Sequence, residues 1–269
     1  MNSISFITAN FVGRELGYQV TEGWYQGNNA TNDYFRPIDT FRKRFNALLR
    51  EIKDLGFQAI DLWMAHLHWA WATKDHTKIA NSLIAKHGIK ISSMAGNWGE
   101  NQLEFEAACR LANAIEVRLL TGSAPFLATH REVAVEILRR YNLEIALVNR
   151  REKDTDSMLR RIGYDNHDII GAAFDTAWFH RMGVDLMDAF EALAPNLKMV
   201  RLKNIKSTEE ATTCLYSKGC IPLEDCVAKL KEIKFNGILS IEHYRFDKNP
   251  AEECRQNFEM VKNWLSLPS

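Results

Sequence analysis

The sequence predicts a single α/β domain of the (β/α)8 barrel class, and three observations predict it together. Short apolar runs typical of buried strands recur along the chain, and after the first unit their starts lie roughly 25 to 40 residues apart, the length of a βα unit. Amphipathic, helix-like stretches fill the intervals between these runs. No Ser/Gly-rich linker, charge block or low-complexity tract interrupts the series, so residues 1–269 are expected to form one domain.

Eight strands are expected, and consecutive βα units in that number close a parallel barrel. In chain order they are "ISFIT" from Ile4, "QAIDLW" from Gln58, "IKISSMA" from Ile89, "VRLLTG" from Val117, "LEIALV" from Leu143, "IIGAAFD" from Ile169, "LKMVRLK" from Leu197 and "GILSIEH" from Gly237.

One helix is predicted by a clear apolar stripe. The segment "PIDTFRKRFNALLREIKDLG" carries apolar residues about every three to four positions and stops at Gly56. The residues of the stripe are Phe41, Phe45, Leu48, Leu49 and Ile52. Thr129 and Glu132 have the spacing of a capping box at a helix start, and Pro222 suits a first helical turn.

The connection after the first strand, residues 10–37, is far longer than the ~2 to 6 residues usual for such loops. It is rich in Gly, Asn and aromatic residues. Two interpretations stay open: a lid over the mouth of the barrel, or a surface excursion packed on its own aromatic side chains.

The amino-acid composition limits the classes of molecule that the protein is expected to bind. The 46% hydrophobic content supports a large core, and 34 Lys and Arg residues balance 34 Asp and Glu residues. This balance argues against nucleic acid or an anionic membrane as partner and favours a small molecule. No stretch reaches the ~18 apolar residues that span a bilayer and no leader pattern opens the sequence, so a cytoplasmic location is expected. Whether the protein forms a homo-oligomer is left open.

Polar residues that close the predicted strands should gather at one rim, because the active site of such a barrel lies at the carboxyl ends of its strands. Asp175 closes strand 6 and Glu242 closes strand 8. An Asp at a strand end is often only a helix N-cap or a turn former. A Glu inside an apolar barrel is costly unless it is paired, so the two acids together favour a functional site.

His66 and His68 follow strand 2 in "DLWMAHLHW". If the strand continues that far, both imidazoles lie on one face, where they could share a metal. If the segment is already loop, they are expected to hydrogen-bond substrate hydroxyls or to play a structural part.

The segments "GFQAIDLW", "AFDTAWFHRMGVD", "LKMVRLKNIK" and "CLYSKGCIPLEDCVAKLKEIKFNGILSIEH" resemble the xylose-isomerase-like TIM barrels, the sugar phosphate isomerase/epimerase family that also contains endonuclease-IV-type repair enzymes. The resemblance covers nearly the whole chain. It implies one divalent metal, often manganese, held by a Glu, an Asp, a His and a Glu at the ends of strands 5 to 8. It also implies that the two glutamates move protons between adjacent carbons.

This sequence keeps only half of the set that the resemblance implies. Asp175 and Glu242 match, but Val148 stands where the family has the first Glu, and Arg201 stands where it has the His. Two carboxylates are a poor cage for manganese or zinc. We therefore expect no metal cofactor, or at most one Mn or Zn ion held weakly by Asp175 and Glu242. We expect Arg201 to replace the metal, with Asp175 neutralising it.

The resulting expectation is a sugar or sugar-phosphate isomerase/epimerase-like protein that transfers protons through one base. The expected catalytic residues are Glu242, Arg201, Asp175 and Lys203, and the expected substrate-binding residues are His66, His68, Asn149, Trp178 and His243. Two alternatives stay open: a catalytically silent barrel that binds a sugar or polyol, and a metal enzyme that takes its missing ligands from His66 or His68. A role in DNA repair is disfavoured because the sequence lacks a basic stripe for the phosphate backbone.

Overall fold

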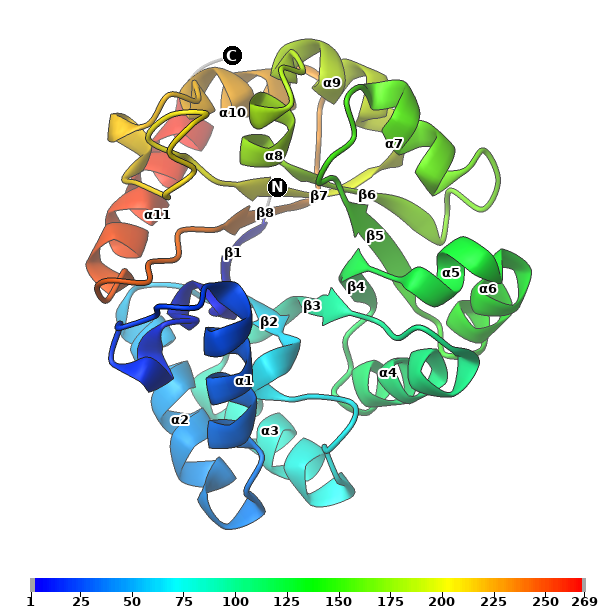
Figure 1. The fold of residues 1–269 in the computed structure, drawn as a ribbon, viewed down its shortest axis with the longest axis vertical. Helices are drawn as coiled ribbons and strands as arrows, with labels where there is room; N and C mark the ends of the chain where they lie inside the picture. The colour runs from blue at the N-terminus through cyan, green and yellow to red at the C-terminus, as the bar shows by residue number, and fades with distance from the viewer. Residues whose placement is uncertain (1–2, 268–269) are drawn as a thin grey trace.

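The protein is a closed barrel of eight parallel strands in consecutive order, in which the first strand also pairs with the last. The structure is a computed structural model, and it describes residues 3–267. The helices surround the barrel as an outer ring (Figure 1). The expected single α/β barrel is confirmed.

The strands are β1 (Ser3–Ile7), β2 (Ala59–Trp63), β3 (Lys90–Asn97), β4 (Leu119–Ser123), β5 (Glu144–Val148), β6 (Ile170–Asp175), β7 (Leu197–Leu202) and β8 (Ile238–Ile241). The helices are α1 (Trp24–Phe35), α2 (Ile38–Asp54), α3 (Lys74–His87), α4 (Gln102–Ala114), α5 (Pro125–Thr129), α6 (Arg131–Arg140), α7 (Thr155–Ile162), α8 (Thr176–Arg181), α9 (Leu186–Leu193), α10 (Leu223–Glu232) and α11 (Ala251–Ser266). Short 3-10 turns include η1 (Thr8–Phe11), η2 (Arg14–Leu16) and η3 (Met64–His66).

All eight predicted strands are present, and the predicted amphipathic helix is α2. Its five predicted apolar residues are all buried. The helix ends where expected, because Gly56 takes a φ of 96°, a backbone conformation that favours glycine. Pro222 lies immediately before α10, at its N-cap position.

The predicted capping box at Thr129 and Glu132 is wrong. Thr129 is the last residue of the short helix α5, and its hydroxyl donates to the carbonyls of Pro125 and Phe126. The following helix α6 begins at Arg131 without a side-chain cap. Pro125 starts a helix of its own just upstream, so the threonine hydroxyl is used at a helix end instead of a helix start.

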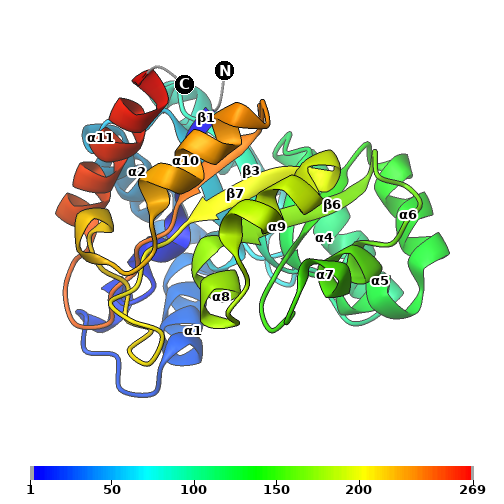
Figure 2. The same ribbon diagram turned by 90° about the horizontal axis from the view of Figure 1, so that it is seen from above.

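The long first connection contains the 3-10 turns η1 and η2 and a full helix, α1. Figure 2 shows α1 and α8 at the same end of the barrel. The ring of Trp24 on α1 lies 5.4 Å from the ring of Trp63, the last residue of β2, and 5.0 Å from that of Tyr244, which follows β8. Aromatic contacts therefore hold α1 over the rim, which favours the first of the two open interpretations, a cover over the barrel mouth.

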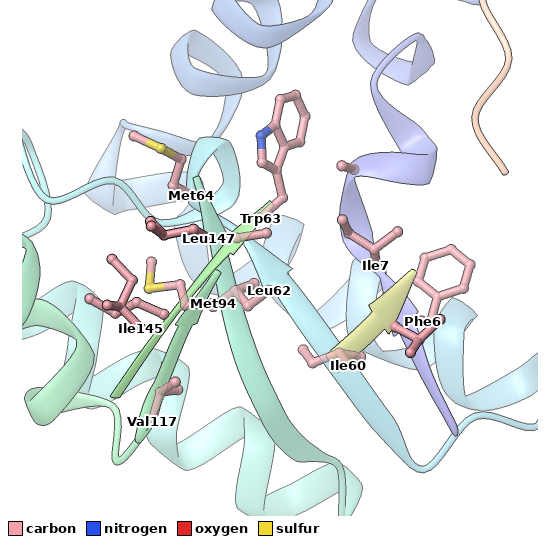
Figure 3. Packing of buried hydrophobic residues seen from close by; sticks show 14 of the residues in the cluster. Phe6, Ile7, Ile60, Leu62, Trp63, Met64, Met94, Val117, Ile145 and Leu147 are labelled. Carbon is pink, nitrogen blue, oxygen red and sulfur yellow. The ribbon is translucent and has the colours of Figure 1, made fainter. Parts of the chain in front are cut away.

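Two apolar clusters pack on opposite faces of the strands. The larger lies between the strands and the helices and includes Ile60, Leu62 and Leu147 (Figure 3). The smaller cluster is formed by residues that alternate with those of the larger one, so strand alternation directs it into the barrel. Its buried members are Leu119, Ala146, Val148, Ala173 and Met199.

The rest of the barrel interior is polar. Ser5, Asp61, Ser93, Thr121 and Ser240 are all fully buried on β1 to β4 and β8. The interior is therefore divided between an apolar side at β4 to β7 and a polar side at β8 to β4. Buried polar groups require partners. The polar side of the interior lies directly beneath the charged residues at the carboxyl ends of the strands, which are described below.

Candidate active site

A cavity of about 690 Å³ opens at the carboxyl ends of the strands. Its floor carries four charged side chains: Asp175, Arg201, Lys203 and Glu242. Six aromatic residues contribute to its walls: Trp24, Tyr25, Trp63, Trp69, Trp178 and Tyr244. Such a mixture of apolar walls and a few convergent polar groups is typical of a binding site for a small molecule.

Lys203 connects the two carboxylates that sequence reasoning placed at this rim. Its Nζ donates to Glu242 Oε1 at 2.7 Å and lies 3.8 Å from Asp175 Oδ2. The same ammonium lies 4.9 Å from the centre of the Tyr244 ring. The side chains of Lys203, Asp175 and Glu242 are each less than 10% exposed, so the interaction is a buried ionic cluster and not a surface ion pair.

Asp175 also has a structural task. It is the N-cap of α8, and its Oδ1 accepts from the backbone N–H groups of Ala177 at 2.9 Å and Trp178 at 3.0 Å. The amide of Asn149 binds the backbone of Asp175 on both sides, donating to its carbonyl at 3.0 Å and accepting from its N–H at 2.6 Å. Both contacts fix the carboxylate at the rim.

Arg201 projects from β7 between two carboxylates. Its Nη1 lies 3.7 Å from Glu242 Oε2, and its Nη2 lies 3.6 Å from Asp61 Oδ2. Nη2 donates a hydrogen bond to Thr121 Oγ1 at 2.8 Å. The expectation that Asp175 neutralises Arg201 is therefore corrected: Asp175 pairs with Lys203, and Asp61 and Glu242 flank the guanidinium.

Asp61 is a site residue that sequence reasoning missed. It is fully buried in the polar half of the barrel interior, where the Ser93 hydroxyl donates to its Oδ1 at 2.6 Å. The available signal was a single carboxylate in the middle of the apolar run "AIDLW". A carboxylate buried in this way needs a partner. In the structure that partner is the Arg201 guanidinium, 3.6 Å from Asp61 Oδ2.

Burial and neighbouring charges shift the carboxylates in opposite directions. Burial raises the pKa of Asp61, although Arg201 acts against it. Burial likewise raises the pKa of Asp175 against the opposing effect of Lys203. At Glu242 burial also acts upward, but Lys203 and then Arg201 outweigh it and hold the pKa below its usual value. Glu242 is therefore the carboxylate that stays ionised most readily.

Lys203 remains protonated despite its burial. Burial alone would lower the pKa of this ammonium, but Glu242, Tyr244 and Asp175 together raise it well above its usual value. Lys203 is therefore a fixed positive charge at neutral pH and not a base.

Of the predicted substrate-binding residues, His68 and Trp178 line the cavity. His66, Asn149 and His243 do not belong to its lining. His66 is buried behind β2, within 3.1 Å of the Thr8 hydroxyl and against the Phe35 ring. Burial lowers the pKa of His66 to about 3 and that of His68 to about 4, so both are neutral at pH 7.

The placement of His66 and His243 has a physical reason. Of the two interpretations of this segment, the loop is the one observed: the strand ends at Trp63 and the chain turns into η3, so the alternation that would put two imidazoles on one face is lost. His243 points away from the rim and contacts Glu253 of α11, with its Nε2 2.9 Å from Oε2. Asn149 does not face the cavity because its amide is bonded to the backbone C=O and N–H of Asp175.

The donors at this site do not fit a divalent metal. Among residues 3–267, no group of three or more His, Cys, Asp or Glu side chains is placed to hold such an ion. Asp175 and Glu242 are both engaged with Lys203, and the Arg201 guanidinium lies next to Glu242. A cation entering here would meet two fixed positive charges and too few ligands.

Comparison with protein families gives one match. A family model described as "Xylose isomerase-like TIM barrel" matches residues 49–264. No curated protein sequence matches the chain significantly. In the part of the chain that the structure describes, no helix has the length and apolar character needed to cross a bilayer.

Several solved structures share the fold. The IOLI protein with a bound zinc atom superposes with a TM-score of 0.70 at 16% identity, over 98% of each chain. The probable 3-DHS dehydratase AsbF of Bacillus anthracis gives a TM-score of 0.68 at 15% identity, over 98% of this chain and 99% of that one. D-Psicose 3-epimerase of Clostridium cellulolyticum H10 gives 0.67 at 12% identity, over 83% of this chain and 94% of that one. At these identities the likeness concerns the fold alone.

Proposed function

Because the chain belongs to the xylose isomerase-like TIM barrel family, we propose that it is an isomerase of carbohydrate-like carbonyl compounds that moves a proton through one base, Glu242. The observation that carries the proposal is the position of Glu242 at the cavity floor, 2.7 Å from Lys203 and 3.7 Å from Arg201. The sugar epimerases and the dehydratase among the similar structures agree with a substrate of this class.

In the proposed reaction the Glu242 carboxylate removes a proton from the carbon next to a substrate carbonyl. The electron pair of the broken C–H bond moves onto the carbonyl oxygen and gives an enediolate. The same carboxyl group then returns the proton to the former carbonyl carbon, and the proton of the hydroxyl on the first carbon passes to the former carbonyl oxygen. The hydroxyl-bearing carbon thus becomes the new carbonyl, and the two carbons exchange oxidation states without any net loss of electrons. Val148 lines the cavity at the position where the family resemblance implies a second Glu, and a valine there favours isomerisation by one base over epimerisation by two.

Arg201 and Lys203 supply the electrostatic part of the proposed mechanism. Fixed cations in a site shielded from water stabilise the charge that develops on the enediolate oxygen. A substrate oxygen that draws the Lys203 ammonium toward itself also weakens the Lys203–Glu242 interaction. Since that interaction holds the pKa of Glu242 low, substrate binding would make the carboxylate a stronger base.

The first prediction concerns the base. Replacing Glu242 with Gln keeps the shape and removes the proton acceptor, so exchange of substrate C–H for solvent deuterium should fall at least about 100-fold. The measurement is proton NMR in deuterium oxide over a panel of aldoses, ketoses and their phosphates. Glu259→Gln on the outer surface of α11 is the control and should exchange like the parent. Undiminished exchange in Glu242→Gln would exclude Glu242 as the base.

A silent binding barrel is the second candidate, and the tight Lys203–Glu242 contact favours it, because a base held by an ammonium is a weak base. It predicts thermal stabilisation by a sugar or polyol with no deuterium exchange in the same panel. Binding without exchange would therefore replace the first proposal with this one.

The second prediction concerns the proposal that Arg201 and Lys203 take the place of a metal. The parent protein should contain no stoichiometric manganese, zinc or cobalt by plasma mass spectrometry, and chelators should not change its melting temperature. Val148→Glu together with Arg201→His restores the family's ligand types at these positions and should create manganese binding. One metal per parent chain would contradict the proposal.

A further inference from the structure

Arg201 uses few of its hydrogen-bond donors. A guanidinium carries five N–H groups, and the side chain here is only 12% exposed. Yet within residues 3–267 its one hydrogen bond is the donation to Thr121. The flanking carboxylate oxygens of Asp61 and Glu242 lie 3.6 and 3.7 Å away, beyond hydrogen-bond distance. Nε is buried and has no partner.

Unmet donors on a buried guanidinium are costly, and Arg usually satisfies them through a forked contact with a carboxylate or phosphate. Because Arg201 also lines the cavity, a bound molecule can supply the missing acceptor. The side chain is therefore built to receive an oxyanion from a ligand.

Part of the charge of Arg201 is available for this purpose. Lys203 already contacts both carboxylates of the cavity floor, Glu242 and Asp175. Asp61 lies below the floor, and burial raises its pKa, which limits the negative charge it presents to Arg201. Arg150, on the loop after β5, adds a second cation to the lining. Glu100 and Glu104 also line the cavity, but they lie across it, after β3.

A complementary acceptor lies beside the free donors. Glu242 Oε2 is buried, has no hydrogen-bond partner and lies 3.7 Å from Arg201 Nη1. A ligand that fits both groups must accept from the guanidinium and donate to the carboxylate through an adjacent atom. A carboxylate with a hydroxyl on the next carbon has that pattern.

We propose that the cavity selects sugar acids over neutral sugars, with the substrate carboxylate on Arg201 and the neighbouring hydroxyl on Glu242. The proposal deepens the function proposed above and rests on it for the reaction, although the binding preference requires no turnover. A carboxylate suits the site better than a phosphate, because a phosphate would bring up to a second negative charge next to Glu242, and Glu242 and Asp61 already flank Arg201.

The test is a comparison of matched ligands. Isothermal titration calorimetry on the full chain would measure the Kd of tetronate, pentonate and hexonate sugar acids and their 2-keto forms, each against the alditol of the same chain length. The Kd of glucose 6-phosphate is measured as well, to compare a phosphorylated sugar with the sugar acids. The best acid should bind at least about tenfold tighter than its alditol, the ratio expected for one charge-assisted hydrogen-bonded contact.

Variants of Arg201 test whether this residue causes the preference for sugar acids over alditols. Arg201→Met, of similar volume without charge, should abolish the preference, and Arg201→Lys, which keeps the charge but loses the fork, should retain a reduced one. Arg255→Met on the surface of α11 should leave it unchanged. Circular dichroism checks that each variant is folded. If Arg201→Met does not fold, the acid-to-alditol affinity ratio of Arg201→Lys is compared with that of the parent protein to test the inference.

Equal affinity for acid and alditol, tighter binding of the phosphate, or no binding of any acid would overturn this inference, whether or not Glu242 exchanges protons. Acid binding that depends on Arg201 without deuterium exchange would support it and count against the isomerase. The two proposals can therefore fail separately.

Discussion

Lys203 is the residue on which the charge balance of the cavity floor depends. Its ammonium is the nearest cation to Glu242 Oε1, at 2.7 Å, and it also faces Asp175. The pKa of Lys203 is raised in the folded protein. A raised pKa on a base contributes stability below the pKa of the unfolded chain, about 10.4, and loses it only as pH rises through the folded value. The contribution is therefore complete at pH 7.

The third prediction follows from this residue. Lys203→Met leaves Glu242 buried without its main partner, and the free energy of unfolding should fall by about 3 to 5 kcal/mol at pH 7. In the double variant Lys203→Met with Glu242→Met, the loss should be smaller than the sum of the single losses, because neither member of the Lys203–Glu242 pair is left without the other. Urea unfolding measures all three proteins. Simple additivity would show that the two side chains do not interact.

Single residues also show what sequence could and could not locate. Asp175, Arg201 and Glu242 are found by reading strand ends, because the carboxyl ends of parallel strands in a barrel share one rim. Asp61 lies inside a strand, and its partner Arg201 comes from a strand far away in the chain. Their proximity depends on the closure of the barrel, which no local pattern encodes.

At the level of elements, α8 and the cavity floor share Asp175. Its Oδ1 caps the helix while its Oδ2 faces Lys203. From the sequence, Asp175 could be either a helix N-cap or a residue of the active site. In the structure one oxygen of its carboxylate caps the helix and the other faces the cavity floor.

The fourth prediction separates these two tasks. Asp175→Asn retains a capping oxygen, so its free energy of unfolding should stay within about 1 kcal/mol of the parent, whereas Asp175→Ala should lose about 1 to 2 kcal/mol more than Asn. Thermal and urea unfolding give the values. Equal losses in both variants would mean that the charge toward Lys203, and not the cap, determines the contribution of Asp175.

The strands and α2 could be predicted because their apolar periodicity is local. Helix α1 could not, since its sequence "WYQGNNATNDYF" has no Leu, Ile, Val or Met to form an apolar stripe and contains three Asn and one Gly. The helix depends on tertiary contacts, including those of Trp24 with Trp63 and Tyr244. Tertiary packing often overrides weak helix propensity in this way.

For the whole molecule, the equal numbers of acidic and basic residues give a sequence pI of about 7.1. A protein without net charge has little electrostatic repulsion between copies. The expected cytoplasmic location and the open question of a homo-oligomer both remain at the level of prediction.

The fifth prediction uses this balance. Light scattering after size exclusion at pH 7 should show weak, concentration-dependent association that disappears at about pH 9, where the chain carries net negative charge. A defined oligomer of constant mass at both pH values would instead indicate a specific interface between copies, because nonspecific association depends on net charge.

The pairing of β1 with β8 has a consequence for synthesis on the ribosome. The first strand emerges early and must wait for the last, Ile238–Ile241, before the ring can close. Glu242 follows that strand directly, so Lys203 and Arg201 gain this carboxylate as a partner only after β8 has been synthesised. A chain stalled before β8 would therefore lack both the closed ring and the contacts of Glu242 with Lys203 and Arg201.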